Sequence, residues 1–233
     1  MPPKSPIAEA YRSLQTNIQF SSTDHQVKLI CITSPGASEG KSTTCANLAL
    51  TYAQMSQRVL LIDADLRCPT QHKLFGLSNG KGLSHMISMK EELDDNIHII
   101  NDTLHVLTTG ILPPNPVELI SSQSMRQFLK DIRERYDMVI IDTPPVGILT
   151  DASLLAAQCD GTLFVVASRK SSIDLTQKAY ENLKFVGAKL IGSVMTMLPI
   201  ENKNYSYYYQ IYEEEASAKK TRKKWFRKKG RLA

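Results

Sequence analysis

The sequence predicts an α/β domain with a mostly parallel central sheet and helices on both faces. Apolar runs of strand length recur along the chain, each closed by small or acidic residues. Most of these runs are continuous rather than alternating, which is expected for strands that are buried on both faces. Helix-like stretches lie between several of them, and alternating strands and helices are typical of parallel sheets with right-handed crossovers.

The predicted elements follow directly from this pattern. Strands are expected at residues 27–33, 59–62, 105–107, 138–141, 162–167 and 190–195. Helices are expected at residues 41–54, 116–135, 151–158 and 173–185.

One helix start carries further signals, and an additional helix is expected before the first strand. Asn115 is a suitable cap for the helix that begins at Pro116, and Glu118 can reach back to complete a capping box. The segment 5–20 also has a helical apolar stripe, although it precedes the first strand. That stripe consists of Ile7, Tyr11, Leu14 and Ile18.

Composition indicates a single folded domain with a tail. The 233 residues are 42% hydrophobic, and the formal charge of +5 comes largely from the basic end at 219–231. We therefore expect a domain at 1–200, with its opening helix at 5–20, and a flexible tyrosine-rich and basic tail at 201–233. Because the body is close to neutral, no nucleic-acid partner is expected.

The sequence shows neither a membrane-spanning run, nor a secretory signal, nor paired cysteines, and these features bear on where the protein is located and whether its cysteines form disulfides. No run approaches the roughly 20 apolar residues that span a bilayer, and the start lacks a secretory apolar region. The four cysteines occur singly, without a CxxC pair, so neither a disulfide framework nor a zinc site is indicated. The sequence therefore predicts a cytoplasmic protein.

The segment LICITSPGASEGKSTT has the strongest chemical signal. A predicted strand ends at Thr33, a loop of small residues follows, and Gly40-Lys41-Ser42 opens a helix. Free N–H groups at such a helix start bind phosphate, Lys41 would reach the β- and γ-phosphates of ATP, and Ser42 would bind Mg²⁺. The predicted phosphate-binding residues are Gly36, Ala37, Ser38, Glu39, Gly40, Lys41, Ser42 and Thr43.

The loop departs from the usual P-loop spacing. Pro35 stands where the first glycine of GxxxxGK[ST] would be, and Gly36 comes one residue late. The alternative interpretation is a Gly/Ser-rich turn between a strand and a helix, with no bound phosphate.

Two acidic strand ends support the phosphate site. VLLIDADLR places Asp63 and Asp65 where a buried strand emerges, on one face if the strand continues, and Arg67 follows closely. MVIIDTPP is an apolar strand that ends in Asp142, as in a Walker B strand. Open α/β sheets bind ligands at this edge, so a metal or general-base role is predicted for these carboxylates.

These three motifs together resemble those of the bacterial tyrosine kinases, the BY-kinases of capsule and exopolysaccharide production. TSPGASEGKST is similar to the family's Walker A motif, LLIDADLR to its Walker A′ motif and VIIDTPP to its Walker B motif. The stretch GILPPNPVELISS also resembles a family segment. The resemblance implies a P-loop NTPase fold of MinD/ParA-like architecture, with ATP and Mg²⁺ as cofactors.

The resemblance also implies a role for each site residue. Asp63 would be the general base for the tyrosine hydroxyl, with Lys41, Asp65 and Arg67 completing the catalytic set. Ser42, Asp63 and Asp142 would be the metal ligands. The autophosphorylation sites would be the tyrosines of ENKNYSYYYQIYEEE, namely Tyr205, Tyr207, Tyr208, Tyr209 and Tyr212.

Partners are implied in the same way. Glu9, Arg12 and Gln15 resemble the family's ExxRxxR interface motif, although the last arginine is replaced, and Glu9 and Arg12 would pair between subunits of a ring. An octamer is one candidate for that ring. The alternative to pairing between subunits is a solvated ion pair between Glu9 and Arg12 within one helix.

Other partners would be a membrane adaptor of the polysaccharide chain-length regulator type, a cognate tyrosine phosphatase and further protein substrates. The adaptor would recruit this split form of the kinase to the inner face of the membrane.

Two other functions remain open at this point. A MinD/ParA-like ATPase would act as a membrane-associated switch without kinase activity, but its signature lysine, five residues before Lys41, is replaced by Gly36. A nucleotide-dependent scaffold without catalysis is the third class. The intact set of Lys41, Asp63, Asp65 and Asp142 counts against it.

Overall fold

The computed structural model describes residues 5–21 and 26–199. Leu14–Met197 form one compact unit, here called the main unit. The described residues of the second unit are 5–13 and 198–199. The five tail tyrosines that are the predicted phosphorylation sites lie outside the described residues.

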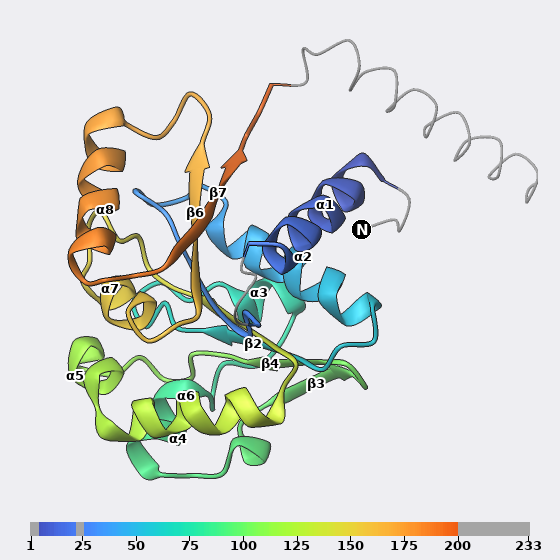
Figure 1. The fold of residues 1–233 in the computed structure, drawn as a ribbon. Helices are drawn as coiled ribbons and strands as arrows, with labels where there is room; N and C mark the ends of the chain where they lie inside the picture. Colours follow the sequence, from blue (N-terminus) through green and yellow to red (C-terminus); the bar gives the residue numbers. More distant parts are fainter. Residues whose placement is uncertain (1–4, 22–25, 200–233) are drawn as a thin grey trace, which may run out of the picture. The chain divides into compact units, whose positions relative to one another are not determined.

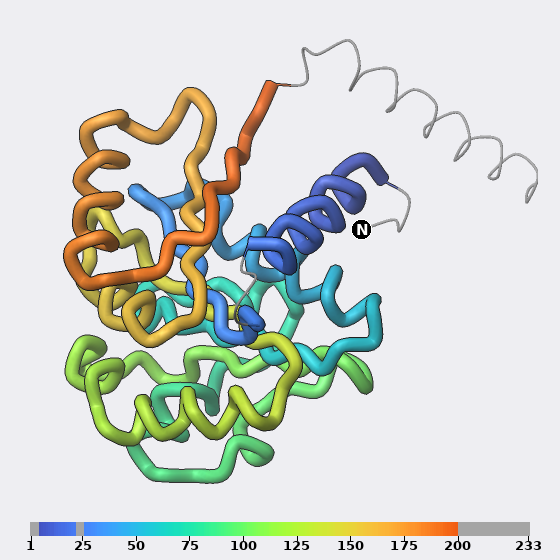
Figure 2. The backbone as a smooth tube through the Cα atoms, in the orientation of Figure 1, coloured from blue at the N-terminus to red at the C-terminus, as the bar shows by residue number. Residues whose placement is uncertain are grey.

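The main unit is built on one seven-stranded sheet with the strand order β3-β4-β2-β5-β1-β6-β7, and Figure 2 traces its backbone. The strands are β1 Leu29–Thr33, β2 Val59–Asp63, β3 His98–Asn101, β4 Leu104–Leu107, β5 Met138–Asp142, β6 Gly161–Ala167 and β7 Leu190–Thr196. Neighbouring strands are parallel except for β3 and β4, which pair antiparallel. The predicted fold class is therefore confirmed.

The helices of the described residues lie between Pro6 and Phe185 (Figure 1). Their bounds are α1 Pro6–Gln19, α2 Lys41–Gln54, α3 Gln71–Phe75, α4 Leu83–Met89, α5 Pro116–Ser121, α6 Gln123–Arg135, α7 Asp151–Ala156 and α8 Ile173–Phe185, with a 3-10 turn η1 at Leu93–Asp95. Among the described residues, none of the helices is both long enough and apolar enough to cross a membrane.

Side-chain alternation divides the core into two layers. Leu60 and Ile62 of β2 belong to a cluster with residues of α4–α8, whereas the intervening Leu61 does not. On the other side, the sheet is covered by α2, whose Leu48 and Tyr52 are fully buried. Figure 1 shows α2 on one side of the sheet and α4 and α6 on the other. Because both faces are covered, β1, β2 and β5 are buried at every position.

Several boundaries differ from the sequence predictions. The helix expected at 116–135 is two helices, because Ser122 adopts an extended conformation (φ −63°, ψ 156°) and its side chain caps α6 by accepting from Met125 N at 3.0 Å. The capping box at Asn115 is wrong, since its amide contacts the Glu118 carboxylate and caps no backbone N–H. Strand β3 and helices α3 and α4 were not predicted at all.

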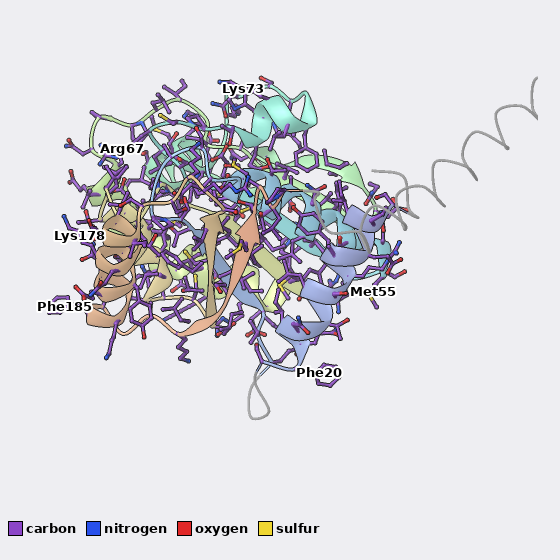
Figure 3. The ribbon with its side chains drawn as sticks, turned by 90° about the horizontal axis from the view of Figure 1, so that it is seen from above. Phe20, Met55, Arg67, Lys73, Lys178 and Phe185 are labelled. Atoms are coloured by element: carbon purple, nitrogen blue, oxygen red, sulfur yellow. The ribbon has the colours of Figure 1, made fainter. Side chains whose placement is uncertain are left out.

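Helix α1 matches the predicted segment but not the predicted stripe. Of its four stripe residues only Ile18 is buried, and Ile7 is 45% exposed. Gln15 is buried instead, and its amide donates to the sulfur of Met55 at the end of α2. Figure 3 labels Met55 next to α1 and Phe20 just beyond the end of that helix. The third position of the interface-like motif is therefore used for packing within the main unit.

The cysteines behave as small core residues for the most part. Cys31, Cys45 and Cys159 are buried, and Cys68 is exposed. Burial, and then the charge of Asp142, raise the pKa of the Cys45 thiol, so that this thiol stays protonated beside Asp142.

Candidate active site

The loop between β1 and α2 has the backbone that a phosphate-binding loop requires. Gly40 directly precedes α2 with φ 90°, in the left-handed region where glycine has no Cβ penalty, and Ser38 has φ 57°. Within the loop, Gly36 N donates to Glu39 Oε2 at 3.0 Å, and Ser34 Oγ donates to Gly36 O at 2.7 Å. The loop is therefore shaped by its own side chains.

Neighbouring strands fix the same loop from outside. Thr196 at the end of β7 donates its hydroxyl to Glu39 O at 2.6 Å, and Ser171 after β6 donates to Glu39 Oε1 at 2.7 Å. Lys170 Nζ donates to Ser38 O at 2.6 Å. Glu39 was predicted as a phosphate-loop residue. Its carboxylate accepts hydrogen bonds from Gly36 N within the loop and from the Ser171 hydroxyl, so the side chain braces the loop. Its role in phosphate binding remains a prediction.

The two acidic strand ends lie side by side. Asp63 and Asp142 are register partners on the parallel strands β2 and β5, and Ala64 N donates to Asp142 O at 2.8 Å. Both carboxylates are fully buried. The prediction that one edge of the sheet gathers them is confirmed.

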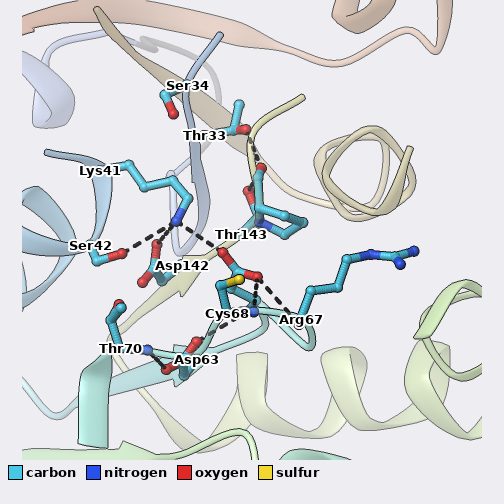
Figure 4. Close-up of polar contacts among 12 residues, drawn as sticks. Thr33, Ser34, Lys41, Ser42, Asp63, Arg67, Cys68, Thr70, Asp142 and Thr143 are labelled. Carbon is cyan, nitrogen blue, oxygen red and sulfur yellow. Dashed lines mark hydrogen bonds and ion pairs between the residues drawn. The ribbon is translucent and has the colours of Figure 1, made fainter. Parts of the chain in front are cut away.

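Lys41 connects the loop to these carboxylates (Figure 4). Its Nζ lies 3.2 Å from Asp65 Oδ2, 3.4 Å from Asp142 Oδ1 and 3.3 Å from the hydroxyl of Ser42. Burial disfavours the ammonium form, but the charges of Asp142 and Asp65 outweigh it and raise the pKa of Lys41 above its ordinary value. A permanent cation therefore stands among two acids and a hydroxyl.

Asp63 has a different environment from Asp65, although the sequence placed them on one face. Its Oδ2 accepts from Thr70 N at 2.9 Å and from Gln71 N at 2.8 Å, at the start of α3. Burial and the charge of Asp142 nevertheless raise the pKa of Asp63 to about 7. A carboxylate with a pKa near neutrality is well suited to accept a proton at physiological pH.

Lys41, Asp65 and Asp142 form a group that is here called the lysine–carboxylate cluster, and Arg67 does not join it. Its Nε donates to Asp151 Oδ2 at 2.8 Å, and Asp151 is fully buried at the start of α7. Figure 4 shows the side chain directed away from Lys41. Only the backbone N of Arg67 contacts the cluster, by donating to Asp65 Oδ1 at 3.4 Å. A catalytic role for its guanidinium therefore remains a prediction.

One residue of the site was not predicted. Gln71 is fully buried, and its side-chain amide donates to Asp142 Oδ2 at 2.8 Å and to Ser42 O at 3.0 Å. Glutamine has no distinctive sequence signal, and α3 itself was not predicted. Only the recognition that Asp63 caps a short helix would have drawn attention to this position.

The predicted interface pair is found within one helix. Glu9 and Arg12 form an exposed ion pair at spacing i,i+3 in α1, which is the alternative that the spacing alone favoured. Such a pair contributes little to stability, because both groups are solvated. Pairing between subunits stays a prediction.

The donor set fits a magnesium nucleotide. Among the described residues there is no group of three or more His, Cys, Asp or Glu arranged to hold a metal ion by themselves. Magnesium characteristically takes only one or two protein carboxylates and completes its shell with waters and substrate phosphates. Ser42 Oγ and Asp142 Oδ1, both in contact with Lys41 Nζ, are the groups that would hold it.

A groove in the main unit touches the loop's surroundings only through Ser171. It has a volume of about 720 Å³ and lies between α8 and strands β6 and β7. None of its lining residues belongs to the lysine–carboxylate cluster. We therefore assign the active site on the convergence of charged groups at the loop.

Comparisons with known proteins agree with this geometry. A family model described as ParA, NUBPL iron-transfer P-loop NTPase, matches residues 26–231. Tyrosine-protein kinase YwqD of Bacillus subtilis is 43% identical over 208 residues, which cover 88% of this chain and 88% of that protein. The chain belongs to the bacterial tyrosine-protein kinases, within the ParA-type P-loop NTPases.

Solved structures agree with the assignment to the tyrosine-protein kinases. The chimerical protein CapA2B2 has a TM-score of 0.81 and 42% sequence identity, and the match covers 85% of this chain and 88% of that one. The septum site-determining protein MinD of Pyrococcus horikoshii has a TM-score of 0.61 at 23% identity, covering 72% of this chain and 69% of that one. The second likeness concerns the fold alone, and it confirms the predicted MinD/ParA-like architecture.

Proposed function

We propose that this tyrosine-protein kinase transfers the γ-phosphate of ATP to tyrosines of its own C-terminal cluster, in trans between subunits. The observation that carries the proposal is the convergence of Lys41, Ser42, Asp65 and Asp142 at a glycine-containing loop, with Asp63 beside them. Family membership supports the reaction class, and the site supplies groups for each part of it.

Nucleotide binding would rest on the loop and Lys41. Backbone N–H groups at the start of α2 would surround the phosphates, and the Lys41 ammonium would leave Asp65 for the β- and γ-phosphates. Ser42 and Asp142 would hold Mg²⁺, which neutralises charge on the transferring group. Lys41 already contacts both of these residues.

The transfer needs a base for the phenol. The tyrosine oxygen forms a bond to the γ-phosphorus while the bond to the ADP oxygen breaks, and Asp63 takes the phenolic proton. A tyrosine hydroxyl has a pKa near 10, so a carboxylate poised near 7 assists its attack. Positioning and charge neutralisation would supply the rest of the catalysis.

The tail would be the substrate. Tyr205, Tyr207, Tyr208, Tyr209 and Tyr212 follow β7, and the end of that strand contacts the phosphate loop through Thr196. About ten residues of extended chain reach roughly 35 Å. This reach allows the cluster of one subunit to enter the site of a neighbour.

Phosphotyrosine mapping tests the proposal. The full chain, with and without a peptide of the adaptor's cytoplasmic segment, is incubated with Mg-ATP and digested for mass spectrometry. We expect phosphate between Tyr205 and Tyr212, and a control chain with these five tyrosines changed to phenylalanine should remain unlabelled. Hydrolysis of ATP with an unmodified tail would overturn the kinase proposal and favour a MinD/ParA-like switch.

We further propose that the chain assembles into a ring through Glu9 and Arg12. Glu9→Ala should lower the mass measured by light scattering, because the pairing acid between subunits is lost. Glu118→Ala is the matched control on α5, where the carboxylate only contacts the Asn115 amide. Equal masses for wild type and Glu9→Ala would remove the interface role.

The cellular role would be control of capsular or extracellular polysaccharide synthesis and export. We propose that a membrane adaptor of the chain-length regulator type recruits the cytoplasmic kinase to the inner face of the membrane, and that a cognate phosphatase reverses the modification. Charge accumulating on phosphorylated tails would drive ring disassembly by repulsion. These partners follow from the family resemblance.

A further inference from the structure

We infer that Gln71 is the positioning residue that sets the affinity of the site for Mg²⁺ when nucleotide is bound. This inference rests on the proposed nucleotide function, and it concerns a residue that none of the three phosphate-site motifs contains. The carrying observation is that one buried amide joins the Asp142 carboxylate, which is expected to hold the metal, to the backbone carbonyl of Ser42, whose hydroxyl is the other expected ligand.

The geometry of the Gln71 side chain is unusually constrained. Its Nε2 donates at 2.8 Å to Asp142 Oδ2 and at 3.0 Å to the carbonyl of Ser42. Both partners are acceptors, so the nitrogen, and not the oxygen, must face them. The residue is fully buried at the start of α3. The amide therefore ties the Walker B carboxylate to the first turn of α2.

This bond decides which Asp142 oxygen is available. Oδ2 is occupied by the Gln71 amide, while Oδ1 faces Lys41 Nζ at 3.4 Å. A carboxylate held by one oxygen presents the other in a fixed direction, toward the side where Lys41 and the Ser42 hydroxyl meet. Groups that orient metal ligands in this way affect metal affinity by about 10- to 100-fold.

The same residue also reaches the predicted base. Its backbone N donates to Asp63 Oδ2 at 2.8 Å, so α3 begins at a point held by both Asp63 and Asp142. In addition, the side-chain oxygen of Gln71 is buried and has no hydrogen-bond partner among the described residues. A buried amide oxygen without a protein donor suits a water molecule, including one bound to the metal.

The test compares nucleotide binding with and without metal. Gln71→Met keeps the length of the side chain but removes the amide. We expect the Mg²⁺ concentration for half-maximal binding of a fluorescent ADP to rise about tenfold, with the affinity for metal-free ADP changed by less than about twofold. In kinase assays, excess Mg²⁺ should restore most of the turnover, with little change in the KM for ATP.

Gln127→Met is the matched control, because the Gln127 amide also donates to a carboxylate, that of Asp131, on the exposed face of α6. It should leave the Mg²⁺ dependence unchanged. Gln71→Asn serves as a second variant if Gln71→Met does not fold, and its shorter amide should also raise the Mg²⁺ requirement.

The outcomes separate the two proposals. If wild type does not bind ADP, the proposed nucleotide site itself is wrong, and if it binds ADP equally with and without Mg²⁺, the proposed metal site is wrong. If wild type depends on Mg²⁺ and Gln71→Met has the same half-saturation, only the positioning role is overturned. A uniform loss of ADP affinity in both conditions would indicate a purely structural role for Gln71, and it would also overturn the inference.

Discussion

Lys41→Met is expected to reduce tyrosine phosphorylation by at least about 10²- to 10³-fold, the loss typical when one preorganised charge or donor at a reaction centre is removed. The Lys41 ammonium lies within 3.4 Å of Asp65, Asp142 and Ser42. It is therefore at the meeting point of the groups proposed to bind the magnesium nucleotide. The measurement is the initial rate of tail labelling at saturating Mg-ATP, with circular dichroism to establish that the variant is folded.

The matched control for Lys41→Met is Lys178→Met. Lys178 is exposed on α8, and Figure 3 shows it on the outside of the main unit. This substitution removes the same charge and adds the same side chain, so its rate should stay close to that of wild type. If the Lys41 variant were folded and labelled its tail within about tenfold of wild type, Lys41 would have no role in phosphate binding.

Asp63→Asn is expected to lower turnover by about 10²- to 10⁴-fold, the contribution typical of a general base. Asparagine keeps the shape of the side chain and can still accept hydrogen bonds from the backbone N–H groups of Thr70 and Gln71. In the structure these nitrogens lie 2.9 and 2.8 Å from Asp63 Oδ2. What it loses is the ability to take the phenolic proton. The kcat should therefore fall while the affinity for ATP, measured by titration calorimetry, changes little.

Asp137→Asn provides the comparison for Asp63→Asn. Asp137 directly precedes β5, at the opposite end of the strand from Asp142, and its Oδ2 accepts from Arg58 N at 2.8 Å. Its substitution should leave kcat unchanged. A folded Asp63→Asn protein with the turnover of wild type would assign the base to another group, of which Asp65 is the nearest candidate because it shares the Lys41 contact.

The sheet and the catalytic carboxylates were predictable because they depend on local patterns. All six predicted strands include the observed strand or fall short of it by one residue at an end, since short continuous apolar runs are typical of strands that are buried on both faces. Asp63 and Asp142 each end such a run. The parallel order of β2 and β5 then places them opposite one another. The apolar runs therefore predict parallel strands, and the parallel strands bring the carboxylates at their ends together.

Features that depend on tertiary contacts could not be predicted. Strand β3 alternates between half-buried and exposed positions at the edge of the sheet, so His98–Asn101 carries no continuous apolar run. The break at Ser122 is invisible in a segment whose apolar period continues on both sides. Arg67 follows Asp65 in sequence, yet its partner is Asp151, 84 positions away. The role of Gln71 could not be predicted either, because it depends on tertiary contacts with Asp142 and Ser42.

The central claim is that one site gathers Lys41, Ser42 and Asp142 around a magnesium nucleotide, with Asp63 beside it. A crystal structure of the chain with Mg-ADP tests this claim most directly. We expect the Lys41 ammonium to have moved from Asp65 to the β-phosphate, the Ser42 hydroxyl to bind Mg²⁺, and Asp142 to contact the metal or one of its waters. A nucleotide bound outside the 36–43 loop, or a metal out of reach of both Ser42 and Asp142, would contradict the account.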